Sequence, residues 1–154
     1  MKLFRGFELA HGQYRVSKQE ADGKMSGRAV TVSEPATELN FEEHLSGGEY
    51  ILGIIPLLID NSCHFGLIDV DIRGEAKLNE TLESLEKKIR ELPLVLCRSK
   101  SGGAHLYMFC NPSIPAIDMV SKLNEFAAQL GYGGSEIFPK QKSRANDRDR
   151  GNWI

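Results

Sequence analysis

The chain has 154 residues, of which 41% are hydrophobic and 26% are charged, and its formal net charge is −2. These values are typical of one globular domain that buries a hydrophobic core without disulfides. The net charge by itself does not indicate nucleic-acid binding. No apolar run approaches the roughly 18–20 residues of a membrane span, and no cleavable signal pattern stands at the N-terminus. We therefore expect a cytoplasmic protein without a membrane partner.

Residues 1–62 are less regular than the rest and predict a small N-terminal αβ module packed on the main core. Thr37 or Asn40 can cap a short helix that ends before Gly47. The mostly apolar segment 51–59 then predicts a strand or a buried turn. No internal repeat or low-complexity segment interrupts this organisation.

Residues 63–154 show a clearer alternation of strands and helices. We predict strands at 64–72, 94–97, 104–110 and 135–139, a helix from Asn79 to Leu92 and a helix from Pro115 to Leu130. The order β-α-β-β-α-β is that of a ferredoxin-like or RRM-like α+β fold, with one antiparallel sheet that carries both helices on one face. In this topology the first strand of the core lies between the third and the fourth, and the other face of the sheet is open.

The helix limits follow from capping residues and from apolar spacing. Asn79 is the expected N-cap of the first helix and Pro93 its stop, while Pro115 opens the second helix and Gly131 follows it. The positions expected to face the core are Leu82, Leu85, Ile89 and Leu92 in the first helix, and Ile117, Val120, Leu123, Ala127 and Leu130 in the second. The short apolar strand 94–97 is expected to be covered on both faces or to lie on an interior edge.

The cysteines Cys63, Cys97 and Cys110 are odd in number, widely spaced and set in apolar segments. This pattern predicts reduced thiols in the core rather than a disulfide framework. His64 follows Cys63, but no second ligand pair stands at zinc spacing, so we do not expect a zinc site.

Asp69 and Asp71 carry the strongest chemical signal in the sequence. They alternate with Ile68, Val70 and Ile72, which predicts a strand that buries the apolar face and shows both carboxylates on the other. Side chains two residues apart on a strand share a face, with Cα atoms roughly 6.5–7 Å apart. Two carboxylates at this spacing can converge on one or two divalent ions, although an exposed edge strand would show the same pattern.

The predicted topology brings further polar groups to the aspartates. His105 begins the third strand of the core, with Tyr107 in the same phase, and Glu136 lies on the fourth strand. Both strands neighbour the one that carries Asp69 and Asp71, at about 4.8 Å. We therefore expect His105 and three acids on one open face, although a lone strand histidine is more often a hydrogen-bonded surface residue.

Two further segments could bind phosphate. The turn formed by Ser99, Lys100, Ser101, Gly102 and Gly103 leads into His105 and offers hydroxyl, ammonium and backbone N–H donors. Most glycine-rich turns only connect strands, so this signal is weak when taken alone. The basic stretch 138–151, which includes Lys140 and Gln141, is either a solvated loop or a phosphate-contacting one.

Together these segments resemble the archaeo-eukaryotic primases, the primase-polymerase superfamily. The segments Ile68–Asp71, Ser99–His105 and Ser135–Gln141 are similar to the family's acidic hDhD/E motif, its SxH motif and its third acidic motif. The likeness is closest to the primase domain of TOTE conflict systems. Leu45 with Gly47–Pro56 resembles a further segment of those domains, and Gly151–Ile154 resembles the start of their GNWINLP segment. The likeness covers nearly the whole chain.

This resemblance implies a metal-dependent, template-directed nucleotidyltransferase that makes or extends primers from NTPs or dNTPs. It matches Asp69, Asp71 and Glu136 to the metal-binding acids, for Mg²⁺ or Mn²⁺, and His105 with Ser101 to the motif for the incoming nucleotide's phosphates. Many members have aspartate where Glu136 stands. The implied partners are a single-stranded DNA template, a primer and a helicase or further replication domain. The chain stops inside the GNWINLP-like segment, so we expect an excised domain or a shortened protein.

Two other functions fit parts of the sequence. A non-catalytic RRM-like module would bind single-stranded nucleic acid by stacking bases on Tyr107 and Phe109, but the first core strand offers aspartates where such modules place aromatic residues. A nicking nuclease on a similar sheet would need a second histidine beside His105 and a tyrosine nucleophile on a helix, and the sequence offers neither at the expected positions.

Overall fold

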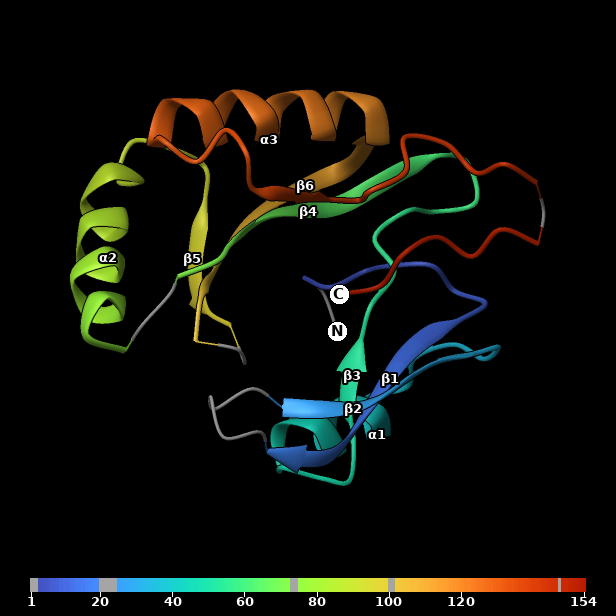
Figure 1. The fold of residues 1–154 in the computed structure, drawn as a ribbon. Coiled ribbons are helices and arrows are strands. Elements are labelled where there is room, and N and C mark those ends of the chain that lie inside the picture. The colour runs from blue at the N-terminus through green and yellow to red at the C-terminus, as the bar shows by residue number, and fades with distance from the viewer. Residues whose placement is uncertain (1–2, 20–24, 73–74, 100–101, 147) are drawn as a thin grey trace.

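The computed structural model describes residues 3–19, 25–72, 75–99, 102–146 and 148–154. Its elements in chain order are β1 (His11–Gln19), β2 (Met25–Val32), α1 (Glu38–Leu45), β3 (Ile51–Gly53), β4 (Ser62–Val70), α2 (Glu75–Lys88), β5 (Val95–Arg98), β6 (Ala104–Pro115), α3 (Ala116–Leu130) and β7 (Glu136–Phe138). They form two antiparallel sheets, with strand orders β2-β1-β3 and β5-β6-β4-β7. Figure 1 shows α3 over one face of the larger sheet and the smaller sheet below the other face.

The larger sheet has the predicted ferredoxin-like arrangement. β4, the first strand of this core, pairs with β6 on one side and with β7 on the other, and β5 pairs with the outer edge of β6. The α+β prediction and the central place of the first core strand are therefore confirmed.

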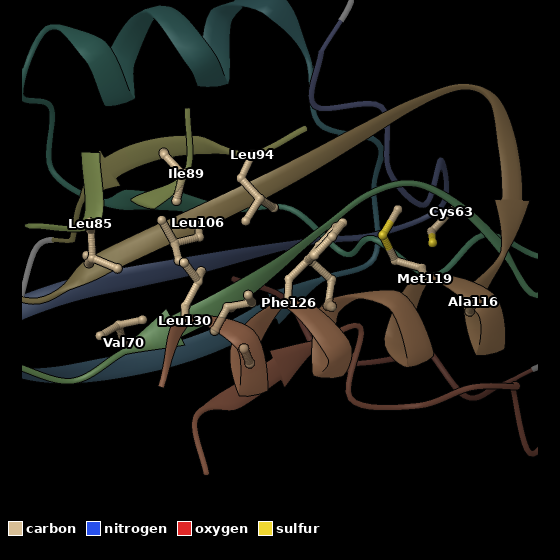
Figure 2. Close-up of a cluster of buried hydrophobic side chains, with 14 of the residues drawn as sticks. Cys63, Val70, Leu85, Ile89, Leu94, Leu106, Ala116, Met119, Phe126 and Leu130 are labelled. Atoms are coloured by element: carbon tan, nitrogen blue, oxygen red, sulfur yellow. The ribbon is translucent and has the colours of Figure 1, made fainter. Parts of the chain in front are cut away.

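The main core lies between this sheet and the helices. Ile68 and Val70 of β4 point into it together with Leu106 of β6, and Leu123 of α3 packs against them. Figure 2 shows side chains from α2, α3 and the strands meeting in this layer. Complete burial of each large aliphatic side chain contributes about 1.5–3 kcal/mol, so this layer fixes which face of β4 turns inward. The opposite phase of β4, which includes Asp69, must then point away from the helices.

Several predicted boundaries are wrong. α2 begins at Glu75, so Asn79 lies inside the helix and not at its N-cap. Pro115 is the N-cap of α3, so the helix begins at Ala116, one residue later than predicted. Ile117 is 54% exposed, and Met119 and Phe126 fill the core instead. The apolar spacing of this helix allows either Ile117 or Met119 to face the sheet. Packing against the sheet buries Met119 and leaves Ile117 at the surface.

The limits of the strands also differ from the prediction. β4 ends at Val70 because Val70 and Asp69 are the last residues with partners in β6 and β7, so Asp71 follows the strand and does not lie within it. β5 is an exposed edge strand, not a covered one, and its Val95 is half exposed. Cys97 on the same strand is exposed, so of the cysteines only Cys63 is a fully buried core thiol.

The N-terminal part contains a long hairpin that was not predicted from the sequence. β1 and β2 pair from His11 with Val32 out to Gln19 with Met25. The helix after it was predicted well, since Thr37 caps α1 and forms a reciprocal capping box with Asn40. Of the apolar segment 51–59, only Ile51–Gly53 forms a strand.

An aromatic cluster joins the N-terminal part to the face of the larger sheet opposite α3. Phe4 makes edge-to-face contacts with Phe65, Tyr107 and Phe109, at centroid distances of 5.3–5.4 Å. Leu52 and other side chains of the same cluster extend it towards α1. This face was expected to be open along its whole length, but the aromatic cluster covers it at the Phe109 end.

Trp153 fastens the C-terminal segment to the smaller sheet. Gly12 of β1 and Gly53 of β3 are cross-strand partners, and a Cβ at either position would lie within 2.3 Å of the indole ring. Ile154 also exchanges backbone hydrogen bonds of 2.8 and 3.1 Å with Ile54, which follows β3. The two glycines therefore form a flat seat for the tryptophan ring.

Candidate active site

A row of side chains crosses the larger sheet at one end. Cys97 of β5 pairs in register with His105 of β6, His105 pairs with Asp69 of β4, and Asp69 pairs with Glu136 of β7. Directly opposed residues in antiparallel strands share a face, with Cβ atoms about 4.5–5.5 Å apart. The row lies on the face turned away from α3, beyond the part that the aromatic cluster covers. Neither His105 nor Glu136 projects into the core.

His105 is held between a carboxylate and a phenol. Its Nε2 lies 3.4 Å from Asp69 Oδ1, and its Nδ1 lies 3.1 Å from the Tyr107 hydroxyl. The Tyr107 hydroxyl can donate to Nδ1 in the tautomer that carries its proton on Nε2, and Nε2 then faces a carboxylate, which can only accept. Burial, with smaller effects of Cys97 and Asp69, raises the pKa of Tyr107 to about 12, so this hydroxyl keeps its proton. Tyr107 thereby fixes the orientation of the imidazole.

From the sequence, Tyr107 is predicted as a residue on which bases stack, not as a hydrogen-bond partner of His105. The signal for its second role was present, because residues two apart on a strand share a face. Its ring is packed against Phe4 and Phe109, so it does not offer a free surface to a base. This packing disfavours the RRM-like stacking function.

The acids line one surface pocket of about 450 Å³. Asp69, Asp71 and Glu136 border it together with Tyr132, and the backbone from Gly134 completes the wall. Although Asp71 follows β4 and does not lie within it, it reaches the same pocket as Asp69. The Glu136 carboxylate is occupied, since its Oε1 lies 2.7 Å from Lys140 Nζ.

The carboxylates do not converge on one point. Among the residues that the structure describes, no group of three or more His, Cys, Asp or Glu side chains is arranged to hold a metal ion. Asp69 faces His105 and Glu136 faces Lys140, which separates the oxygens. The donor set nevertheless suits a hard divalent ion, because Mg²⁺ prefers carboxylate oxygens. The Glu136–Lys140 pair is also exposed, and exposed pairs of this kind contribute only about 0–1 kcal/mol.

The turn before His105 is closed by its own hydrogen bonds. The Ser99 hydroxyl accepts the Gly103 N–H at 2.9 Å, and the Ser99 carbonyl accepts the Gly102 N–H at 3.2 Å. Gly103 is also packed so closely on β4 that a Cβ would lie 2.5 Å from the Val70 carbonyl oxygen. Ser99, Gly102 and Gly103 therefore shape the turn. Lys100 and Ser101, which were predicted to bind phosphate, lie outside the described residues.

The basic stretch has a mixed role. Lys140 reaches the pocket through Glu136, whereas the Gln141 side-chain oxygen accepts the Asn152 N–H at 3.1 Å and so supports the C-terminal segment. The Arg144 guanidinium lies 4.1 Å from the centre of the Phe7 ring. Of these residues, only Lys140 contacts a group of the candidate site.

The fold and this row of side chains define an α+β domain with an acidic, histidine-bearing sheet face. Residues 8–154 match the family described as the TOTE conflict system, Archaeo-Eukaryotic Primase domain. The chain therefore belongs to this family, as the sequence motifs had suggested. A comparison with curated proteins found no match. In the part of the chain that the structure describes, no helix is long and apolar enough to cross a membrane.

Proposed function

We propose that this protein is the catalytic domain of a primase-polymerase, a metal-dependent and template-directed nucleotidyltransferase that makes or extends primers from nucleoside triphosphates. The observation that carries the proposal is the cross-strand row of His105, Asp69 and Glu136 beside Asp71, at the open end of the sheet. Family membership supports primase-like nucleotidyl transfer in general. We further propose single-stranded DNA as template, and a helicase or further replication domain as a helper.

In this proposal Asp69, Asp71 and Glu136 hold Mg²⁺ or Mn²⁺ in the shared pocket. When bound, such ions lower the pKa of the primer 3′-hydroxyl and stabilise the charge on the pyrophosphate that leaves. Glu136 must first part from Lys140, which costs little because both side chains are exposed. Lys140 is then free to donate to a phosphate oxygen. The same rotation would thus create an acidic metal ligand and a basic phosphate ligand.

His105 is placed to orient the triphosphate beside the acids. Its Nε2 lies 3.4 Å from Asp69 Oδ1, and the Tyr107 hydroxyl lies 3.1 Å from the other ring nitrogen. A phosphate oxygen above the row would accept from Nε2 in place of, or together with, the carboxylate. Lys100 and Ser101 are proposed to add donors from the turn, since the backbone N–H groups of Gly102 and Gly103 are used within it.

The test is incorporation of labelled NTPs and dNTPs on a primed single-stranded template with Mn²⁺ or Mg²⁺. Asp71→Asn should reduce incorporation by at least about 100-fold, because it removes a charged ligand without changing the shape of the side chain. Asp71 is exposed and follows the strand, so the melting temperature should be unchanged. Asp118→Asn, an exposed aspartate in the first turn of α3, is the matched control and should retain full activity.

Two results would contradict the proposal. Incorporation by Asp71→Asn at the wild-type rate would remove the metal assignment. Absence of incorporation by the wild-type protein with every metal and nucleotide, together with metal-independent strand binding, would favour the non-catalytic binding module instead.

A further inference from the structure

The β1–β2 hairpin places two arginines directly opposite each other. Arg15 of β1 and Arg28 of β2 are cross-strand partners, so their side chains leave the same face of the hairpin. Both side chains are exposed. Like charges in this position destabilise a strand pair. The pairing is therefore not explained by the stability of the hairpin.

Neither guanidinium has a compensating carboxylate in the described part of the chain. The ion pairs and side-chain hydrogen bonds there do not include Arg15 or Arg28. The charge of Arg15 does reach Tyr50, whose hydroxyl donates to Glu43 at 2.6 Å. That carboxylate is thus already bound to a neutral partner. With respect to the described residues, the arginine pair is therefore an uncompensated double positive charge at the surface.

The face that carries the arginines is also left free by the C-terminal segment. Gly12 and Gly53, which seat Trp153, belong to the alternate phase of the smaller sheet. Arg15 and Arg28 therefore point to the opposite side from the tryptophan. In Figure 1, β1 ends and β2 begins on the same side of the molecule as the end of β4 and the start of β6. The hairpin and the acidic row thus share one side of the fold.

We propose that Arg15 and Arg28 together grip a phosphate of a nucleic-acid strand, which makes the β1–β2 hairpin a backbone-binding arm. Two guanidinium groups on one face match the planar, multidentate contacts that phosphate oxygens accept. A phosphate between them also removes their mutual repulsion. Contacts to the backbone carry no sequence information, which suits a protein that must hold any template. The identity of the strand as template or primer rests on the proposed function, whereas the phosphate contact does not.

The test is binding of a labelled single strand of about 20 nucleotides, long enough to span several phosphates, measured by fluorescence anisotropy in EDTA without nucleotide. DNA and RNA strands of one sequence form two arms, and both should respond because they share the phosphate. The double variant Arg15→Gln/Arg28→Gln should bind about 10-fold more weakly, and the slope of log K against log salt should fall by about 0.7 for the lost phosphate. Arg90→Gln, an exposed arginine in the turn region after α2, is the control and should change neither.

Unchanged affinity and an unchanged salt slope in the double variant would overturn the inference. The melting temperature should not fall, because the substitutions remove a repulsion. If it does fall, the variant Arg15→Lys/Arg28→Lys is the test, because it keeps both positive charges but not the guanidinium groups. Weaker binding with the wild-type salt slope would support the arginine contact to phosphate, and wild-type affinity would overturn it. Incorporation assays stay separate, because inactive wild-type protein would sink the proposed function while unaltered strand binding by the double variant would sink only this inference.

Discussion

The substitution Tyr107→Phe isolates one hydroxyl in the candidate site. In the structure this hydroxyl lies 3.1 Å from His105 Nδ1, and it is the group that fixes which nitrogen of the imidazole faces Asp69. The ring itself packs against Phe4 and Phe65, at centroid distances of 5.3 and 6.5 Å. Phenylalanine keeps these ring contacts, so the variant removes the hydrogen bond and little else.

The expected effect follows from the strength of a single hydrogen bond. A neutral intramolecular bond contributes about 0.5–1.5 kcal/mol, which corresponds to a factor of about 2–12 in an equilibrium or rate. His105 is only partly exposed, so water replaces the lost partner incompletely, and we expect a fall of about 5-fold in kcat/KM for the nucleotide. Because burial raises the pKa of Tyr107 to about 12, titration of this hydroxyl itself should not contribute to the defect at neutral pH.

Steady-state primer extension with varied nucleotide concentration measures this effect, together with thermal unfolding. Tyr50→Phe is the matched control, since it also deletes a tyrosine hydroxyl that makes a side-chain hydrogen bond, here to Glu43, but Tyr50 stands outside the row. A merely structural role for Tyr107 would lower the melting temperature and leave kcat/KM of the folded protein unchanged. That outcome would refute the assignment of Tyr107 as the residue that positions His105.

Two further predictions test the open face and the C-terminal seat. Cys97 is exposed opposite His105, so Mn²⁺ with a nucleoside triphosphate should slow its alkylation, which mass spectrometry follows. Burial raises the pKa of this thiol, so the rate of labelling should rise at a higher pH than for an ordinary thiol. A labelling rate of Cys97 that the nucleotide does not change would contradict the proposed nucleotide position. Gly53→Ala would bring a methyl 2.3 Å from the ring of Trp153, so we expect a loss of about 1–3 kcal/mol of stability and a red-shifted emission from this single tryptophan. Gly133→Ala, where the nearest atom lies at 3.7 Å, should change neither, and a blue-shifted or unaltered spectrum of Gly53→Ala would show that the ring is not seated there.

The predicted core is confirmed in the structure because several short segments each carry their own apolar pattern. Alternation at Ile68 and Val70 fixed which face of the strand is buried, and it fixed the outward direction of Asp69 with it. The pairing of Asp69 with both His105 and Glu136 then followed from a topology with few alternatives. The β1–β2 hairpin was missed because β2 is exposed along most of its length and shows no buried alternate phase. Alternation of apolar and polar residues reveals a strand only where one of its faces is buried, and few side chains of β2 are buried.

From residue order alone one could read the fold class, the acidic motif, its histidine and the family resemblance, because each depends on neighbours only a few positions apart. Tertiary structure alone decided that Phe4 covers the Phe109 end of the sheet face and that Arg15 is the cross-strand partner of Arg28. These contacts join residues through strand register and side-chain packing. Register depends on all the strands of a sheet at once, and no single segment of the chain encodes it.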